Sequence, residues 1–202
     1  MDLESKSTKE LTETRLRYYL LASLFAALTA VGAFIKIPLP YVPITLQPVF
    51  VILAGSVLGP KYGALSQLIY LAAGLSGAPI FANGGGPAYV LQPTFGYLVG
   101  YPIGAYVVGV LVHRSPRHLR SGSHIFLLLC VAGFTGMMII LIVGASGLYL
   151  NFKFVAHKPL SMSTLFFSYF LFFIPGDIIK VILSSLTALR LHRIIPIYSH
   201  PR

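Results

Sequence analysis

The sequence predicts an all-α integral membrane protein with six transmembrane helices, and three observations lead to this prediction. The 202-residue chain is 56% hydrophobic and only 10% charged, whereas soluble domains are roughly a quarter charged. Its apolar residues recur in long runs that are separated by prolines, glycines and basic clusters. The basic clusters are distributed unequally between alternate loops, as they are between the two faces of membrane proteins.

The first three apolar runs are separated by residues that break helices. A helix needs about 20 residues to cross the hydrocarbon core of a bilayer, and residues 18–37 reach that length before Pro38. Residues 44–58 form a second run, which ends at Gly59-Pro60, and residues 62–75 form a shorter third run. Because proline and glycine interrupt helices, we expect three separate spans, of which the third is the shortest.

The last three runs are longer. Residues 94–112 end ahead of a cluster of arginines, and residues 125–150 contain four glycines. The sixth run covers residues 165–191 and is interrupted at Pro175-Gly176. Each of these runs is long enough to cross the bilayer as a helix.

Charges in the loops predict that both termini face the cytoplasm. With the N-terminus inside, eleven basic residues fall on the inner side and three on the outer side. Cytoplasmic loops carry such an excess of Lys and Arg, and five spans would place the C-terminal arginines outside. The inner residues are Lys6, Lys9, Arg15, Arg17, Lys61, Arg114, Arg117, Arg120, Arg190, Arg193 and Arg202, and the outer ones are Lys36, Lys153 and Lys158.

The remaining polar residues divide the chain into one membrane domain and two short tails. We expect a polar cytoplasmic tail over residues 1–17, a six-helix transmembrane domain over residues 18–193 and a short basic tail over residues 194–202. The basic residues do not alternate with aromatic residues on one stripe, so we expect no nucleic-acid partner. The single Cys130 excludes an intramolecular disulfide, and residues 1–17 do not resemble a secretory signal.

Asp177 and Lys180 are the strongest candidates for a binding site. Asp177 is the only acidic residue beyond residue 17, and its spacing from Lys180 places both side chains on one face of the sixth helix. Each such residue costs roughly 2.5–3.5 kcal/mol at mid-membrane, so intramembrane ionisable residues usually serve a function; the alternative is an ion pair that only locks helices together. Pro175-Gly176 predicts that a half-helix begins beside Asp177 and lines a cavity.

A glycine-rich segment without charges, residues 78–93, is predicted to connect the third and fourth helices on the outer face. It contains Asn83, which offers a donor and an acceptor, followed by three glycines that allow close approach of the backbone to a ligand. Apolar loops with glycine hinges usually pack onto another part of the protein. The segment is either a connector that rests on helix ends or a lid over a binding cavity.

Further polar residues are expected at the outer ends of two helices. Thr45 and Gln47 lie at the mouth of the second helix, and Gln92 and Tyr97 at the start of the fourth. They serve either as helix caps or as contacts to a ligand. The aromatic residues nearby form either an interfacial belt or the walls of a ligand site: Tyr41, Phe81, Tyr89, Phe95 and Tyr97.

Small residues recur on one face of the first helix. Ala22, Ala26 and Ala30 are four residues apart, a spacing that lets two helices approach closely. This face either packs inside the bundle or docks a helix of a partner protein.

Signatures of catalysis are absent from the sequence. It contains no HExxH, no paired carboxylates, no nucleophile elbow and no Walker A motif, and its histidines lack the spacing of metal ligands. An enzyme that uses Asp177 as an acid or base would have only one carboxylate in the membrane. A purely structural subunit would leave Pro175-Gly176 and the glycine-rich segment unexplained. We therefore expect a binding protein with no catalytic residue, metal or cofactor.

Five stretches together resemble a known family. They are residues 27–40 (ALTAVGAFIKIPLP), 42–47 (VPITLQ), 77–82 (GAPIFA, followed by the glycines), 96–102 (GYLVGYP) and 175–180 (PGDIIK). From about Leu20 to Leu191 the chain resembles the BioY family, the biotin-specific S components of energy-coupling factor (ECF) transporters. It departs from the family pattern at Phe95-Gly96, where a glycine pair commonly precedes the tyrosine, and at Pro48.

The resemblance implies a six-helix protein of the cell membrane that binds biotin near the outer surface, beneath loops. It implies a transmembrane coupling subunit and ATPase subunits as partners, although some members act alone. It places Asp177, Lys180 and Asn83 at polar positions that contact biotin, and the small residues of the first helix on the face toward the coupling subunit. A carboxylate accepts the N–H groups of biotin's ureido ring, and a lysine or asparagine donates to its carbonyl. Lys180 alternatively meets biotin's carboxylate or neutralises Asp177, and another small vitamin is the alternative substrate.

Overall fold

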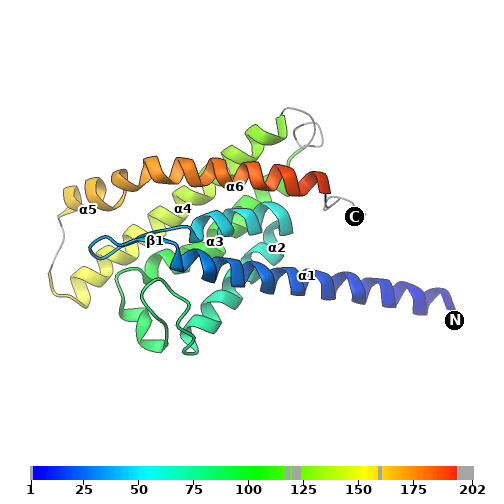
Figure 1. The fold of residues 1–202 in the computed structure, drawn as a ribbon, viewed down its shortest axis with the longest axis horizontal. Coiled ribbons are helices and arrows are strands. Elements are labelled where there is room, and N and C mark those ends of the chain that lie inside the picture. The colour runs from blue at the N-terminus through cyan, green and yellow to red at the C-terminus, as the bar shows by residue number, and fades with distance from the viewer. Residues whose placement is uncertain (1, 117–118, 120–123, 159–160, 195–202) are drawn as a thin grey trace.

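The computed structural model describes residues 2–116, 119, 124–158 and 161–194, which form a helical bundle (Figure 1). Residues 117, 120 and 195–202, with three of the arginines assigned to the inner side, lie outside the described residues. The elements are α1 (Asp2–Phe34), β1 (Lys36–Ile37), β2 (Ile44–Thr45), α2 (Gln47–Leu75), η1 (Pro87–Leu91), α3 (Phe95–His113), α4 (His124–Phe154), α5 (Met162–Tyr169), η3 (Leu171–Phe173) and α6 (Ile174–Ile194).

Five stretches of helix are long and apolar enough to span a membrane by length and composition. Large apolar side chains are exposed on the outside of the bundle, such as Leu20, Leu127 and Ile179, each more than 60% exposed. A water-soluble protein rarely exposes apolar surface so widely. The prediction of an all-α integral membrane protein is therefore confirmed. The five stretches are Thr12–Phe34, Gln47–Leu75, Phe95–His113, His124–Phe154 and Ser163–His192.

The first helix is longer than the first apolar run. α1 begins at Asp2, so most of the predicted N-terminal tail continues the helix instead of preceding it. No glycine or proline occurs before Gly32, and the leucines, lysines and glutamates of this region favour helix. Polarity alone does not end a helix, so residues 2–17 extend the first span as helix, and their place in the cytoplasm stays a prediction.

The second and third predicted runs are the two halves of α2, which folds back on itself at Gly59. Gly59 has φ 81° and ψ −178°, a conformation that glycine adopts at little cost. The side chains of Gln47 and Tyr70 are hydrogen-bonded, although a continuous helix would separate them by roughly 34 Å. The two halves therefore lie side by side and run in opposite directions.

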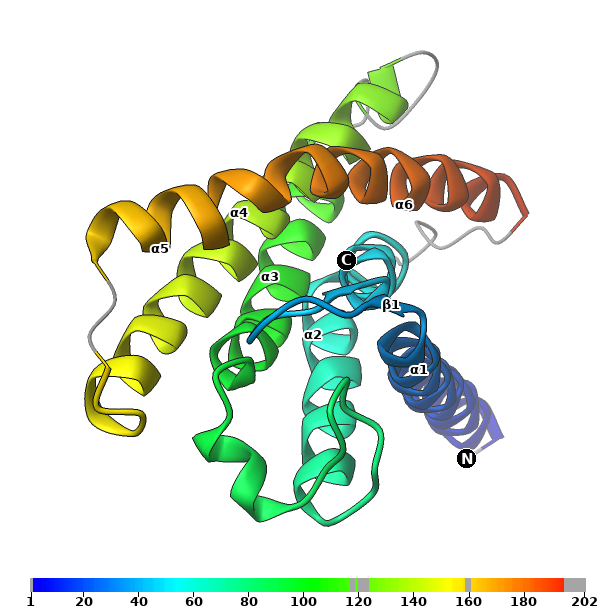
Figure 2. The same cartoon turned by 60° about the vertical axis from the view of Figure 1, so that its left-hand side comes forward.

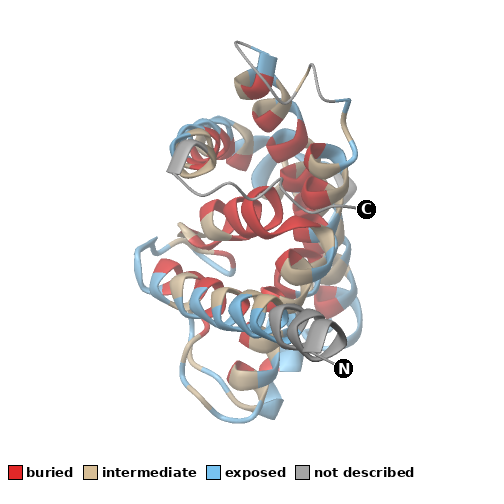
Figure 3. Ribbon diagram, turned by 90° about the vertical axis from the view of Figure 1, so that its right-hand side faces the viewer, coloured by how far each residue is buried: buried red, intermediate tan, exposed pale blue. Residues whose placement is uncertain are grey.

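The start of α2 differs from the prediction because the chain forms a hairpin first. Ile44 and Thr45 pair in antiparallel register with Ile37 and Lys36, so the helix begins at Gln47 instead of residue 44. Pro48 lies in the first turn of α2, where its missing N–H removes no hydrogen bond. The first half of α2 is almost continuously buried in the centre of the bundle (Figure 3).

Glycines bring α3 and α4 into backbone contact near the hairpin. A Cβ atom on Gly147 would lie only 2.6 Å from the Cα of Gly96, and one on Gly144 would lie 2.2 Å from the ring of Tyr97. Small residues permit this close approach between membrane helices. Phe95 precedes Gly96 and lines a groove between α3 and α4 together with Gly96 and Gly147.

The sixth predicted span is divided, but its break lies earlier than expected. α5 ends at Tyr169, and α6 begins at Ile174. Pro175 belongs to the first turn of α6, where proline is tolerated. Asp177 is consequently in the first turn of a new helix, as the sequence predicted.

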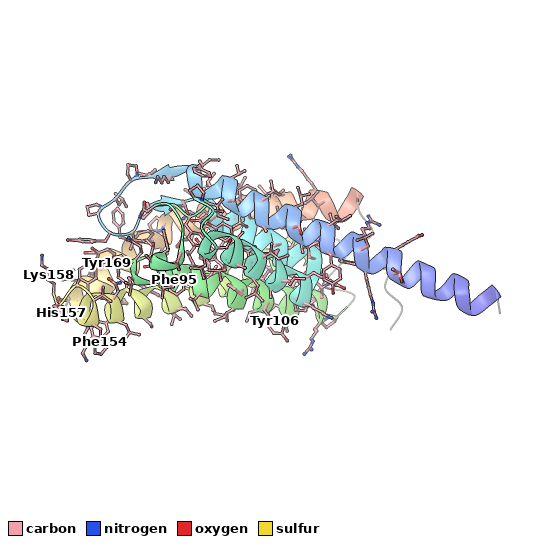
Figure 4. All side chains as sticks on the ribbon, turned by 90° about the horizontal axis from the view of Figure 1, so that it is seen from below. Phe95, Tyr106, Phe154, His157, Lys158 and Tyr169 are labelled. Carbon is pink, nitrogen blue, oxygen red and sulfur yellow. The ribbon has the colours of Figure 1, made fainter. Side chains whose placement is uncertain are left out.

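One end of the bundle carries the hairpin β1–β2, residues 76–94 and α5, and we call it the loop end (Figures 1 and 2). The start of α1 and the last described residue of α6 lie at the opposite end. His157, Lys158 and Phe154 lie at the loop end, whereas Tyr106 lies farther along the bundle and points outward (Figure 4).

Candidate functional site

A cavity lies at the loop end, between the hairpin, residues 76–94, α3, α4, η3 and α6. Its empty space is about 500 Å³, a volume that includes the open space at its mouth. The lining residues are Val42, Pro43, Ile44, Thr45, Gln47, Ala82, Tyr89, Thr94, Tyr97, Leu98, Tyr101, Leu141, Phe173, Asp177 and Lys180.

Asp177 and Lys180 form a buried ion pair in the wall of this cavity. The Lys180 Nζ atom donates to Asp177 Oδ1 at 2.8 Å, and the two residues are 6% and 3% exposed. The other carboxylate oxygen, Oδ2, is buried without a hydrogen-bond partner among the described residues. Because leaving a buried charged oxygen unpaired is costly, this atom is a strong acceptor for a ligand.

Thr45 and Gln47 reach the cavity from the other side, where the hairpin passes into α2. Neither side chain caps the helix, because its N-cap residue is Leu46. Instead the Thr45 hydroxyl donates to Gln47 Oε1 at 3.0 Å, and Gln47 Nε2 donates to the Tyr70 hydroxyl at 2.6 Å. Only the reversal of α2 brings Tyr70 to this point.

Aromatic and apolar side chains complete the walls. Tyr97 and Tyr101 are one turn apart on α3, and Phe173 lies beside them from η3. The Tyr97 hydroxyl donates to the backbone carbonyl of Tyr169 at 3.3 Å, which joins α3 to the end of α5. The cavity thus has one charged pair, a polar corner at Thr45 and apolar surfaces between them.

The segment over residues 76–94 is packed against the ends of its neighbouring helices. Phe81 is buried against Gly74, where a Cβ atom would lie 2.1 Å from its ring. Lys36 of the hairpin donates to the backbone carbonyl of Ala82, and this hydrogen bond connects the hairpin to the segment. Gly84 and Gly86 have positive φ angles of 117° and 97°, which non-glycine residues seldom adopt.

Five of the eight predicted ligand residues therefore line one cavity, and three do not. Asn83 is exposed on the segment, and Gln92 is exposed in a separate groove between α3 and α4. Phe81 is buried between Tyr70 and Tyr89, with ring centroids 5.3 and 4.6 Å away. Contacts of these three residues with a ligand stay predictions, and in this conformation each points elsewhere.

The small-residue face of α1 packs inside the chain itself. Ala22 is 0% and Ala26 5% exposed, and Ala30 is half-buried. Of the two alternatives for this face, the structure therefore favours internal packing. Docking of a partner at these alanines stays a prediction.

The sequence reasoning missed several residues of the site and its hydrogen-bond network, among them Tyr101, Phe173 and Tyr70. Tyr101 follows Tyr97 by four residues, so helical periodicity alone places it on the same face. Phe173 and Tyr70 carried no such local signal, because their positions depend on the break before α6 and on the reversal of α2. No group of three or more His, Cys, Asp or Glu that would hold a metal ion occurs in the part of the chain that the structure describes.

This fold and cavity define a class of protein: a membrane-embedded helical bundle with a cavity at one end, whose wall contains a buried ion pair. The sequence profile of the BioY family matches residues 5–197, so the chain belongs to the BioY family and the resemblance is confirmed.

Individual relatives agree with this assignment. The chain is 45% identical to the "Probable biotin transporter BioY" of Lysinibacillus sphaericus over 85% of each protein. It is 38% identical to the "Biotin transporter BioY" of Thermotoga maritima, over 89% of this chain and 98% of that one. A solved structure of the "S-component for biotin from an ECF-type ABC transporter" is similar with a TM-score of 0.76 and 29% identity, over 90% of this chain and 93% of that chain.

Proposed function

We propose that this protein binds biotin in the cavity at the loop end and serves as the substrate-binding component of a biotin uptake system. The observation that carries the proposal is the buried Asp177–Lys180 pair, whose Asp177 Oδ2 atom has no hydrogen-bond partner within the described residues. The names of the relatives and of the similar solved structure support biotin as the ligand.

The chemistry of the cavity suits the two halves of biotin. The ureido ring carries two N–H donors and one carbonyl acceptor, and Asp177 accepts while Lys180 donates. Charge-assisted hydrogen bonds of this kind are roughly twice as strong as neutral ones. The thioether ring and aliphatic chain fit the apolar walls at Tyr97, Leu141 and Phe173.

In the cell membrane, we propose that the chain crosses the bilayer six times with both termini in the cytoplasm. The two antiparallel halves of α2 supply two of the six passes. The excess of basic residues at the end opposite the cavity supports this orientation. The first half, residues 47–58, is about 18 Å long, shorter than the hydrocarbon core, so Gln47 lies at membrane depth, where protein covers it. The cavity then faces the outside, where biotin is captured.

For partners, we propose a transmembrane coupling subunit and ATPase subunits of an ECF transporter. The sequence has no Walker A motif, so energy for uptake comes from another chain or another driving force. The similar solved structure is that of an S-component from an ECF-type ABC transporter. The part of the chain that the structure describes has no catalytic constellation, and we propose transport without chemistry on the ligand.

The proposal is tested by equilibrium binding of labelled biotin to the purified protein, with other vitamins as competitors. We expect saturable binding that unlabelled biotin abolishes and other vitamins leave unchanged. Displacement by a different vitamin at lower concentration than biotin would reassign the substrate. Absence of any biotin binding by the folded protein would refute the proposal.

A further inference from the structure

A buried chain of hydrogen bonds runs from the cavity to the glycine-rich segment. Thr45 donates to Gln47 (3.0 Å), Gln47 donates to Tyr70 (2.6 Å), and Tyr70 donates to the backbone carbonyl of Ile80 (3.0 Å). The side chains of this chain are 7%, 2% and 1% exposed. Its last acceptor, Ile80, lies in the segment next to Phe81, which packs edge-on against the Tyr70 ring.

The carbonyl of Ile80 fixes the direction of every bond in this chain. A carbonyl can only accept, so the Tyr70 hydroxyl donates its single hydrogen to the carbonyl of Ile80. The Tyr70 oxygen can then only accept from Gln47, which requires the Nε2 side of the Gln47 amide. The Oε1 atom of Gln47 then faces Thr45, and the Thr45 hydroxyl donates its hydrogen to this atom.

Because its hydrogen goes to Gln47, Thr45 can only accept, both from the neighbouring Tyr101 hydroxyl and from a further partner. Thr45 lines the cavity together with Asp177, whose Oδ2 atom also lacks a partner among the described residues. The cavity therefore presents two acceptors, one on a neutral hydroxyl from the hairpin and one on a carboxylate from α6. A cyclic urea presents two N–H donors, one on each side of its carbonyl.

We propose that Tyr70 is a positioning residue: through Gln47 it holds the Thr45 hydroxyl as the acceptor for one ureido N–H, while Asp177 accepts the other. This inference rests on the proposed binding of biotin. It also links recognition to the glycine-rich segment, because the direction of the bonds holds only while Ile80 is in place. When the segment moves away, Gln47 is free to turn and Thr45 to point its hydrogen into the cavity.

The test compares biotin with its two analogues that are methylated on one or the other ureido nitrogen. Binding of the three ligands is measured for the wild-type protein, Tyr70→Phe and Asp177→Asn. We expect Tyr70→Phe to weaken biotin about three- to tenfold, the worth of one neutral hydrogen bond. Discrimination is the ratio of the Kd of a methylated analogue to the Kd of biotin. We expect Tyr70→Phe to reduce this ratio by the same factor for one analogue and to leave the ratio for the other analogue unchanged. Asp177→Asn should reduce discrimination at the other nitrogen.

Further variants separate positioning from loss of structure. Thr45→Val should change discrimination at the same nitrogen as Tyr70→Phe, and Thr45→Ser should retain the wild-type pattern. In the double variant the two effects should not add, because both remove one interaction. Tyr62→Phe is the matched control: Tyr62 is about two turns before Tyr70 on the same helix, but its ring stacks on Tyr18 at 4.8 Å and does not line the cavity.

The outcomes distinguish this inference from the proposed function. Equal weakening of all three ligands in Tyr70→Phe would mean that Tyr70 only supports the fold, and the positioning role would be overturned. If Tyr70→Phe does not fold, Thr45→Val against Thr45→Ser decides the same question, since unchanged discrimination in Thr45→Val excludes Thr45 as an acceptor. Failure of the wild-type protein to bind biotin would overturn both proposals.

Discussion

Replacing Asp177 by asparagine is the most direct test of the binding site. The Oδ2 atom is buried in the cavity wall without a partner in the described part of the chain, so a ligand N–H supplies its missing hydrogen bond. A hydrogen bond to a charged group contributes about 1.5–3 kcal/mol, which corresponds to roughly 10- to 160-fold in Kd. We expect Asp177→Asn to weaken biotin binding by that factor, measured by calorimetry or equilibrium dialysis on purified protein.

The same substitution also removes the partner of Lys180. Breaking a buried ion pair costs about 3–5 kcal/mol of stability, so thermal unfolding must be followed beside binding. In Asp177→Asn combined with Lys180→Met, stability should recover in part while binding does not. Glu13→Gln is the matched control, since this exposed acid of α1 lies outside the cavity. Wild-type affinity in folded Asp177→Asn protein would show that the carboxylate does not bind the ligand.

Other parts of the structure give further expectations. Biotin should slow hydrogen exchange of backbone amides over residues 80–91 if the segment closes on the ligand; protection confined to the opposite end would reverse the proposed orientation. Ala26→Leu should lower both the unfolding temperature and biotin binding, because Ala26 is buried, whereas the exposed Ala27→Leu should change neither. Gly74→Ala, which brings a methyl group against Phe81, should destabilise the protein by about 1–3 kcal/mol, read from its unfolding transition. The purified chain should bind biotin without ATP, and hydrolysis of ATP by it would contradict the transport assignment.

Much of the architecture was predictable because membranes impose simple rules. Apolar length identifies helices that cross a bilayer, and the structure has such helices where the runs were expected. Gly59-Pro60 was expected to end one helix, and the chain does reverse there. α1 begins at Asp2, well before the first apolar run, because a polar sequence can continue a helix beyond the membrane.

The sequence by itself determined the residues that helical periodicity places together. Asp177 and Lys180 share a face because they are three residues apart. The same rule joins Tyr97 and Tyr101, which are four apart, although the sequence analysis did not apply it to Tyr101. Proline before Asp177 predicted the start of a helix, and the structure has one there. These inferences need only the local geometry of one helix, so no knowledge of the rest of the chain was required.

Only the tertiary structure decided which loop residues face the cavity. Asn83 and Phe81 are two residues apart, yet one is exposed and the other is buried. A loop has no fixed period, so its side-chain directions follow from left-handed turns such as Gly84 and from the space that Gly74 leaves for a ring. The hydrogen bond between Gln47 and Tyr70 could likewise not be predicted from the sequence. The two residues are 23 positions apart and meet only because α2 reverses between them.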